Sequence, residues 1–302
     1  MPEGLIVKAL SGYYYVHNFE GGPLVQCRGR GIFKKRGESP LVGDRVVYSE
    51  TENGEGTVEE ILPRQSELIR PQIANADLAV LVFSVIRPEL NFILLDKFLV
   101  HTEHALMDAV IVLTKMDRIP DGEEGEAIRR TVEEARNLYS SIGYQVILTS
   151  AHDGEGLDEL RTALAGHINM LAGQSGVGKS SLVNALVPGL KLETNEISVK
   201  LGRGKHTTRH VELVSIPGGG GYMADTPGFS QLDFGELGID EIASCFREFR
   251  ELPSSCKFRG CSHTHEPHCA VLQAKEQGLI AESRYNNYVS FMTEWKEIKR
   301  RY

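Results

Sequence analysis

Residues 173–180 have the composition and spacing of a phosphate-binding loop, with the sequence Gly-Gln-Ser-Gly-Val-Gly-Lys-Ser. In a G-x-x-x-x-G-K-[ST] loop the backbone N–H groups face the phosphates, Lys179 reaches the β and γ phosphates, and Ser180 ligates Mg²⁺. An apolar run precedes the loop and a helical pattern follows it, which is the order that this chemistry needs. A chance match in a loop is the alternative. The expected contacts are Gly173, Gln174, Ser175, Gly176, Val177, Gly178, Lys179, Ser180 and Ser181.

Two shorter motifs upstream of this loop suit the recognition of guanine. The first follows a predicted strand at 109–113, and the second follows a predicted strand at 144–148. An ionised aspartate only accepts hydrogen bonds, so Asp117 can accept from guanine N1–H and the exocyclic amine. The Ser-Ala turn would offer a backbone N–H to guanine O6, which adenine lacks. Thr114 stands where asparagine is more usual, and we expect it to weaken one orienting hydrogen bond. The residues assigned to base recognition are Thr114, Lys115, Met116, Asp117, Ser150 and Ala151.

The order of these motifs differs from that of a Ras-like domain. There the phosphate loop comes first and the base-reading motifs come last, whereas here the base-reading motifs precede the loop. Because neighbouring termini can be joined and a chain reopened at a surface loop, the same site survives such a rearrangement. We therefore predict a circularly permuted G domain.

The D-x-x-G motif of this domain is expected at residues 225–228, with the sequence Asp-Thr-Pro-Gly. Asp225 should hold Mg²⁺ through water, and the Gly228 N–H should sense the γ-phosphate. The permutation places the motif at the end of the G domain. Its release on hydrolysis is therefore expected to pass motion directly to the C-terminal domain.

The groups that complete hydrolysis are expected in the glycine-rich, basic segment 202–210. One threonine should complete the Mg²⁺ shell; Thr208 is favoured, and Thr207 stays open as the alternative. Phe229 occupies the place of the water-positioning glutamine of Ras-like proteins, and a phenyl ring cannot orient water. His206 is the candidate for that role, although a lone loop histidine is more often simply solvated.

Cysteine and histidine residues gather near the end of the chain in the spacing Cys-x4-Cys-x-His-x5-Cys. Three thiolates and one imidazole suit a closed tetrahedral Zn²⁺ site with no open position for water, so its role is structural. Reduced cysteines in a loop are the alternative. Because the segment has little apolar material, we expect metal removal to unfold it. The predicted ligands are Cys256, Cys261, His263 and Cys269, with His265 and His268 as alternatives to His263.

The bulk properties are those of a cytosolic protein with several domains. At 302 residues the chain is longer than a domain with a single hydrophobic core usually is, which predicts two or three domains. Its net charge of -8 argues against nonspecific binding along nucleic acid. The longest apolar run, residues 78–86, is too short to span a bilayer, and residues 1–10 lack a secretory signal pattern. We expect a cytoplasmic monomer with no membrane partner.

Hydropathy and glycine spacing divide the chain into three predicted domains. Residues 1–70 hold short β-rich pieces, which predicts a small five-stranded barrel that leads into a linker at 63–71. Continuous apolar strands alternate with helices over 71–232, which indicates a parallel sheet covered on both faces. Residues 233–302 are predicted to form a mostly helical, zinc-binding domain.

The predicted barrel also has features suited to RNA. A basic segment occupies residues 28–36, and three tyrosines occupy residues 13–15. Exposed aromatic rings beside basic residues stack on unpaired bases. The alternative is a solvated loop on a packed barrel, with the tyrosines half inside the core.

With all of these motifs placed, the chain resembles the ribosome small subunit-dependent GTPase A (RsgA) family. The resemblance rests on the order TKMD, TSA, GQSGVGKS, HTT and DTPG, after a barrel and before a Cys3His segment, and covers essentially the whole chain. It implies an OB-fold barrel, a GTPase stimulated by the small ribosomal subunit, and a late assembly or checkpoint role near the decoding region. It also implies that the histidine beside the switch threonines, here His206, is catalytic.

Two hypotheses of function follow. In the first, the protein is a GTP hydrolase, its barrel and zinc domain grip ribosomal RNA of the small subunit, and its GTP or GDP state controls release. Slow turnover is expected until the partner completes the water-positioning geometry. In the second, it is a GTP-gated RNA-binding module with incidental hydrolysis. A permuted ATPase is disfavoured by Asp117 and Ala151.

Overall fold

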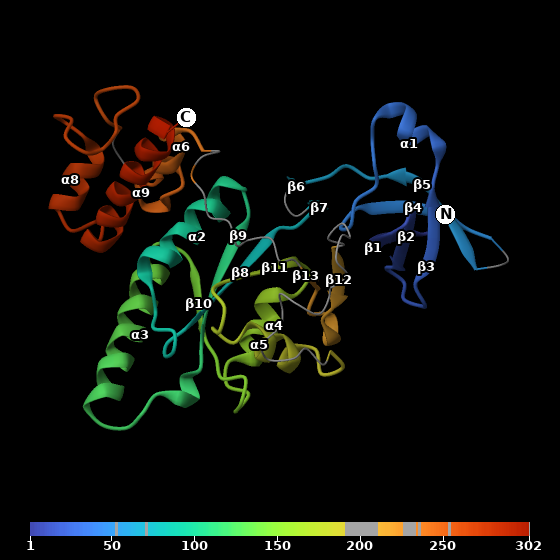
Figure 1. Ribbon diagram of the computed structural model, residues 1–302, viewed down its shortest axis with the longest axis horizontal. Coiled ribbons are helices and arrows are strands. Elements are labelled where there is room, and N and C mark those ends of the chain that lie inside the picture. Colours follow the sequence, from blue (N-terminus) through green and yellow to red (C-terminus); the bar gives the residue numbers. More distant parts are fainter. Residues whose placement is uncertain are drawn as a thin grey trace.

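The computed structural model of the chain has three parts arranged side by side, with the barrel and the C-terminal helices at opposite ends of a central sheet (Figure 1). The structure describes residues 1–51, 54–69, 72–190, 211–225, 234, 237–252 and 255–301. This is the expected multidomain fold of barrel, α/β domain and helical C-terminal domain. Within these residues, no helix combines the length and apolar content needed to cross a bilayer.

The N-terminal part is a closed five-stranded barrel. Its strands are β1 (Glu3–Leu10), β2 (Tyr13–Asn18), β3 (Val25–Gly29), β4 (Arg45–Glu50) and β5 (Glu55–Ile61). The strands pair in the order β1-β2-β3-β5-β4, and β4 closes back onto β1. Fully buried side chains such as Ile6, Val16, Val46 and Val58 fill the interior. The predicted OB-fold barrel is confirmed.

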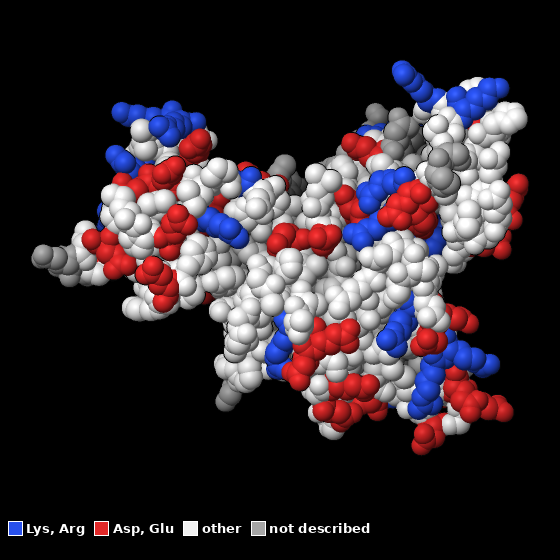
Figure 2. Space-filling view, turned by 180° about the vertical axis from the view of Figure 1, so that it is seen from behind, with Lys and Arg blue, Asp and Glu red and all other residues white. Residues whose placement is uncertain are grey.

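The basic segment of the barrel is more ordered than a solvated loop. It ends β3 and then forms the short helix α1 (Gly31–Arg36), which Phe33, 4% exposed, anchors to the core. Lys and Arg side chains gather at this tip of the barrel (Figure 2). Tyr14 and Tyr15 are half-buried and pack against the core, whereas the Tyr13 ring lies under the Arg28 guanidinium, 4.8 Å from its centroid.

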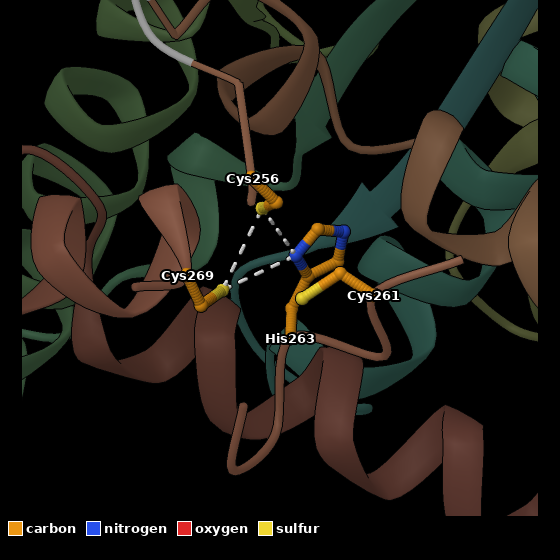
Figure 3. Close-up of side chains that lie close together, drawn as sticks. All are labelled: Cys256, Cys261, His263 and Cys269. Carbon is orange, nitrogen blue, oxygen red and sulfur yellow. Dashed lines mark hydrogen bonds between the residues drawn. The ribbon is translucent and has the colours of Figure 1, made fainter. Parts of the chain in front are cut away.

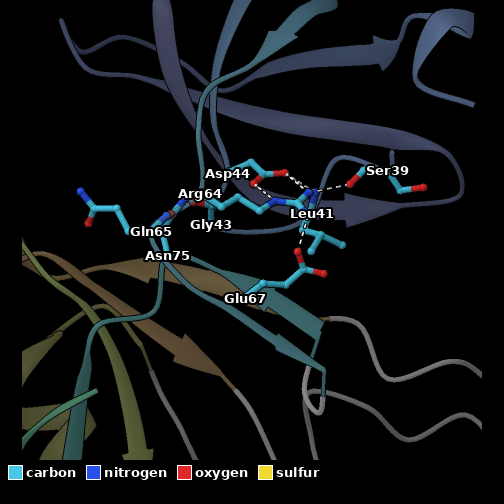
Figure 4. Close-up of polar contacts among 8 residues, drawn as sticks. All are labelled: Ser39, Leu41, Gly43, Asp44, Arg64, Gln65, Glu67 and Asn75. Carbon is cyan, nitrogen blue, oxygen red and sulfur yellow. Dashed lines mark hydrogen bonds and ion pairs between the residues drawn. The ribbon is translucent and has the colours of Figure 1, made fainter. Parts of the chain in front are cut away.

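The predicted linker at 63–71 instead leads into a hairpin of β6 (Glu67–Ile69) and β7 (Gln72–Ala74). Arg64 fixes it to the barrel: its guanidinium donates to both oxygens of the fully buried Asp44 carboxylate at 2.7 and 2.8 Å, and to Glu67 at 2.6 Å (Figure 4). Asn75 adds a hydrogen bond to the Gly43 carbonyl at 2.9 Å. The expectation of a plain linker is wrong, because these long-range contacts order it.

The central part is an α/β sheet covered on both faces. Strands β10, β9, β8, β11 and β13 are parallel neighbours, and β12 adds an antiparallel edge. Successive residues of β8 and β9 point to opposite faces of the sheet and belong to two separate apolar clusters. The first cluster includes residues of α2 and α3, and the second includes residues of α4 and α5, so each face is covered by two helices. The bounds are β8 (Leu78–Ser84), α2 (Phe92–His104), β9 (Asp108–Thr114), α3 (Glu123–Ser141), β10 (Gln145–Leu148), α4 (Leu157–Leu164), β11 (Ile168–Ala172), α5 (Lys179–Leu186), β12 (Glu212–Ser215) and β13 (Tyr222–Asp225).

The C-terminal part is helical and has its own apolar core. Its helices are α6 (Ile239–Ser244), α7 (Arg247–Arg250), α8 (Ala270–Glu276) and α9 (Glu282–Arg301). One side of α9 belongs to this core: Tyr288, Phe291 and Met292 are at most 2% exposed. Phe246 packs against Tyr288 with ring centroids 5.4 Å apart.

A buried ionic network joins this domain to the central sheet domain. Arg284 of α9 is 1% exposed and donates to Asp96 of α2 at 2.6 Å and to Glu248 of α7 at 2.7 Å. Asp96 also accepts from the Tyr139 hydroxyl and the Asn287 amide, so its oxygens are satisfied although burial raises the pKa of its carboxyl. Such a network ties α2, α3, α7 and α9 into one arrangement.

Replacing Arg284 by methionine would leave two carboxylates buried without their cation. We expect this to lower the free energy of unfolding by about 3–5 kcal/mol. Urea denaturation followed by the fluorescence of Trp295, the single tryptophan, would measure it, because this residue packs against the core of the C-terminal domain. Lys296→Met, at an exposed position of the same helix, is the control and should change stability by about 0.5 kcal/mol or less. Equal, small effects of both variants would contradict a stabilising network.

Candidate nucleotide site and metal centre

Three of the loops that carry predicted nucleotide motifs start from the same side of the central sheet. Strands β9, β10 and β11 are parallel, so the segments that follow them, at 115–118, 149–154 and 173–178, meet at the carboxyl ends of the strands. This edge is where open α/β sheets bind ligands. The chain order of the motifs is therefore irrelevant to whether they form one site.

Glycine is required at the start of the phosphate loop. Gly173 has φ +141°, and a Cβ there would lie 2.2 Å from the Val82 carbonyl oxygen of β8. Gly178, with φ +100°, makes the turn into α5, which begins at Lys179. The backbone thus lies directly against β8 and presents the N-terminus of α5 at the strand edge. This geometry suits a phosphate group.

Lys179 spans the phosphate loop. Its ammonium donates to the carbonyl oxygens of Gly173 at 2.6 Å and Gln174 at 2.5 Å, and burial lowers its pKa. Ser180 is 7% exposed at the first turn of α5. Both side chains therefore lie at the junction of loop and helix.

Thr114 and Lys115 bind the phosphate loop to the neighbouring strand end. The Thr114 hydroxyl lies 2.5 Å from the Val177 carbonyl oxygen and 3.2 Å from that of Phe83, and its one proton goes to the shorter contact. Lys115 donates to the Gly176 carbonyl at 2.6 Å and to the Arg87 carbonyl at 2.5 Å. Thr114 was expected to weaken one orienting hydrogen bond because it replaces the more usual asparagine. Its hydroxyl nevertheless holds the phosphate loop through Val177.

Asp117 is oriented by the second base-reading motif. The hydroxyl of Ser150, which is fully buried, donates to Asp117 Oδ1 at 2.9 Å and accepts from the Asp153 N–H at 3.0 Å. Met116 N–H reaches the Thr149 carbonyl at 3.3 Å, which keeps the two loops in register beside Ala151. The sequence assigned Ser150 to base recognition without identifying this orienting contact.

The β8–α2 connection is a part of the site that the sequence did not single out. The carbonyls of Ile86 and Arg87 both accept from the Lys115 ammonium, at 3.5 and 2.5 Å. Because these acceptors are backbone atoms, no side-chain pattern marks them. Burial lowers the pKa of Lys115, and the Arg118 charge lowers it further.

Several predicted residues lie outside the part of the chain that the structure describes. These are His206, Thr207, Thr208, Gly228 and Phe229. The backbone of Asp225 ends β13, but its side chain is not among those described. The groups assigned to Mg²⁺ binding and to hydrolysis, Ser180 included, therefore stay predictions.

Comparison with known proteins decides the family. The model of the RsgA GTPase family matches residues 61–235, and that of the RsgA N-terminal domain matches residues 3–58. The chain belongs to the RsgA GTPase family. Two curated relatives, both named "Small ribosomal subunit biogenesis GTPase RsgA", are 53% identical in Geobacillus kaustophilus and 51% identical in Bacillus anthracis, each over 100% of both chains.

Solved structures agree with the permuted order of motifs. The chain is similar to YloQ, described as a circularly permuted GTPase, with a TM-score of 0.83, 46% identity, and coverage of 98% of this chain and 96% of that one. It is also similar to YjeQ from Thermotoga maritima, with a TM-score of 0.85, 39% identity, and coverage of 97% and 98%. As a member of the RsgA family, the protein is a GTP hydrolase with a circularly permuted G domain.

The C-terminal domain of this RsgA-family chain contains a cluster that could hold a metal ion. The ligand atoms of Cys256, Cys261, His263 and Cys269 all lie within 4.8 Å of one another (Figure 3). His263 Nδ1 is 3.5 Å from Cys256 Sγ and 3.4 Å from Cys269 Sγ. This selects His263 over the alternatives His265 and His268.

The surroundings of the cluster fit a cation. Burial raises the pKa of the Cys261 and Cys269 thiols. Without a positive charge nearby, burial therefore favours the protonated thiols. A bound cation stabilises the thiolates, which are the metal-binding form. The residues present therefore match the donor set of a soft divalent metal.

The unfolding expected on metal removal concerns the ligand segment, and it stays a prediction. The cluster lies on an apolar core that includes Phe246, Phe249, Ile280 and Phe291, all at most 8% exposed. Cys269 belongs to this core, and Cys256 and Cys261 pack against it, but most of the core and the Arg284 network are formed by other residues. The domain therefore has a source of stability besides the four ligands.

Chelation should accordingly loosen the ligand segment while the helices stay folded. We expect chelator treatment to expose the segment 255–269 to proteases and to leave the helical far-ultraviolet circular dichroism of the protein largely unchanged. Limited proteolysis with mass spectrometry would map the cuts. Cys256→Ser is the matched control, because chelation should add little to a variant that already lacks a ligand. Loss of most of the helical signal on chelation would contradict this expectation.

Proposed function

We propose that this protein is a GTP hydrolase that binds the small ribosomal subunit and acts late in its assembly, with the nucleotide state controlling release. The observation that carries the proposal is identity above 50% over the full length of curated relatives named for small-subunit biogenesis. Agreement over both chains from end to end supports carrying the role of the whole protein, rather than that of one domain.

Guanine selection is assigned to the Asp117 and Ala151 region, and phosphate binding to residues 173–181. The contact between Ser150 and Asp117 supports this assignment, because it aims a carboxylate that can accept from both guanine donors. Mg²⁺ bound with GTP would be held by Ser180, Thr208 and Asp225, and would neutralise charge on the phosphates. His206 is proposed to position the attacking water.

The remaining assignments concern the other two domains. The basic tip of the barrel supports a role in ribosomal RNA binding, and the Cys3His cluster supports one structural Zn²⁺. Domain boundaries at 70/71 and 232/233 stay predictions. We further propose that the protein is a monomer in the cytoplasm, where its ribosomal partner would lie.

GTP turnover measured with and without purified small subunits tests the proposed coupling. Because Phe229 cannot orient water, turnover alone should be slow, and the partner should raise it by about 10-fold or more. Large subunits at equal concentration control for nonspecific RNA effects. Equal rates with and without small subunits would contradict the coupling.

Replacing His206 by alanine separates the enzyme from the alternative, a GTP-gated RNA-binding module. The enzyme hypothesis expects loss of stimulated hydrolysis by about 100-fold with small-subunit binding retained, since general acid–base and water-positioning groups contribute on this scale. His104→Ala, at an exposed position of α2, is the control. Unchanged subunit maturation by the His206 variant would favour the binding module.

Base selection has a direct test at Asp117. An Asp117→Asn variant replaces an acceptor with a group that can also donate, so preference should move from GTP toward XTP, whose base has a carbonyl in place of the amine. Competition binding of the two nucleotides would measure the change. Asp121→Asn, at an exposed position shortly after the motif, is the control and should leave the preference unaltered. A variant that still preferred GTP would remove Asp117 from base recognition.

A further inference from the structure

The segment 261–266 of the metal centre folds around one carboxylate. Glu266 Oε1 accepts from the backbone N–H of Ser262 at 2.7 Å and from the Ser262 hydroxyl at 2.6 Å. Its Oε2 accepts from the N–H groups of Thr264 at 3.1 Å and His265 at 3.2 Å. Four donors from three residues thus converge on one side chain, which none of the motifs singled out.

These contacts surround the ligand whose backbone is least favourable. His263 has φ +54°, in the left-handed region that non-glycine residues rarely adopt. The residues on either side of it, Ser262 and Thr264, both donate their N–H groups to Glu266. The carboxylate therefore offsets the cost of the turn that aims the imidazole at the three thiols.

Helix α9 holds the same segment from the other side. The Tyr288 hydroxyl donates to the Ser262 carbonyl at 2.8 Å, and the Tyr285 hydroxyl donates to the His263 carbonyl at 2.9 Å. Both tyrosines belong to the apolar core of the domain. The N–H groups of the segment are thus fixed by Glu266 and its carbonyl groups by a helix, and neither set of contacts involves a metal ligand atom.

We propose that Glu266 is the positioning residue that holds Cys261 and His263 in their ligand-binding arrangement independently of the metal, and so sets the metal affinity of the centre. The inference rests on the proposed metal site. Preorganised ligands lose less conformational entropy on binding, so the metal is held more tightly. Removing groups that orient metal ligands costs about 10–100-fold in affinity.

The variant Glu266→Gln tests this. Glutamine has nearly the same shape as glutamate, but its amide would place N–H donors where the segment needs a hydrogen-bond acceptor. Zn²⁺ affinity would be measured by competition with a chromophoric chelator, and site geometry by the absorption spectrum of the Co²⁺-loaded protein. We expect affinity about 10–100-fold weaker than that of the unsubstituted protein. Glu276→Gln, at an exposed position at the end of α8, is the matched control and should bind as the unsubstituted protein does.

A second measurement, amide hydrogen exchange of the chelator-treated protein, tests the positioning role in the absence of metal. Hydrogen exchange at the amides of Ser262, Thr264 and His265 should be slow in the unsubstituted protein and much faster in Glu266→Gln, while the amides of α9 keep their protection. Ser262→Ala removes one of the four donors and should weaken metal binding in the same direction by less. Retained α9 protection also establishes that each variant has folded.

The outcomes separate this inference from the metal site on which it rests. An unsubstituted protein whose Co²⁺ spectrum lacks tetrahedral thiolate features would overturn the proposed metal site itself. Normal metal binding by the unsubstituted protein together with equal affinity in Glu266→Gln would overturn the role of Glu266 alone. So would rapid exchange of the three amides in the chelated, unsubstituted protein.

Discussion

Two side chains at the end of β9 hold the phosphate loop in place, and the nucleotide site depends on them. The Thr114 hydroxyl and the Lys115 ammonium both bind carbonyl oxygens of this loop, at Val177 and Gly176. The partners lie 63 and 61 residues apart in the chain but on adjoining parts of one sheet edge. The segments assigned to base recognition and to phosphate binding are therefore joined directly, whatever their order in the chain.

The same permutation determines how the C-terminal domain is attached. Phe234, fully buried, stacks on His101 of α2 with centroids 5.3 Å apart and lies 5.1 Å from the Phe291 ring of α9. Trp295 then donates to the Leu237 carbonyl at 2.6 Å. A displacement of Phe234 would therefore be passed to both α2 and α9. Because the Arg284 network also joins these helices, motion would move them as one body rather than hinge one against the other.

Local patterns predicted the strands that lead into the base-reading motifs. The predicted strands at 109–113 and 144–148 became β9 and β10, each end within one residue of its predicted bound. Contacts between distant residues were beyond such reasoning. Nothing near Arg64 indicates its pairing with Asp44, so a linker was predicted at 63–71, where β6 of the hairpin lies. Nothing near Arg284 indicates Asp96. The backbone acceptors of Lys115 have no side-chain signature at all.

The position of the barrel follows from an edge strand. β12 is the last strand of the G domain sheet, and an unpaired edge invites association with other chains. Strand β1 of the barrel covers part of it through the pair Lys8 and Glu212, whose side chains form an ion pair at 2.9 Å. The Tyr222 hydroxyl of the adjoining β13 meets His17 Nδ1 at 2.8 Å. In the chain, β12 follows the segment 202–210, which was assigned to hydrolysis, and β13 runs into the predicted D-x-x-G motif at 225–228. The barrel therefore contacts the two strands to which any movement of these segments would be passed first.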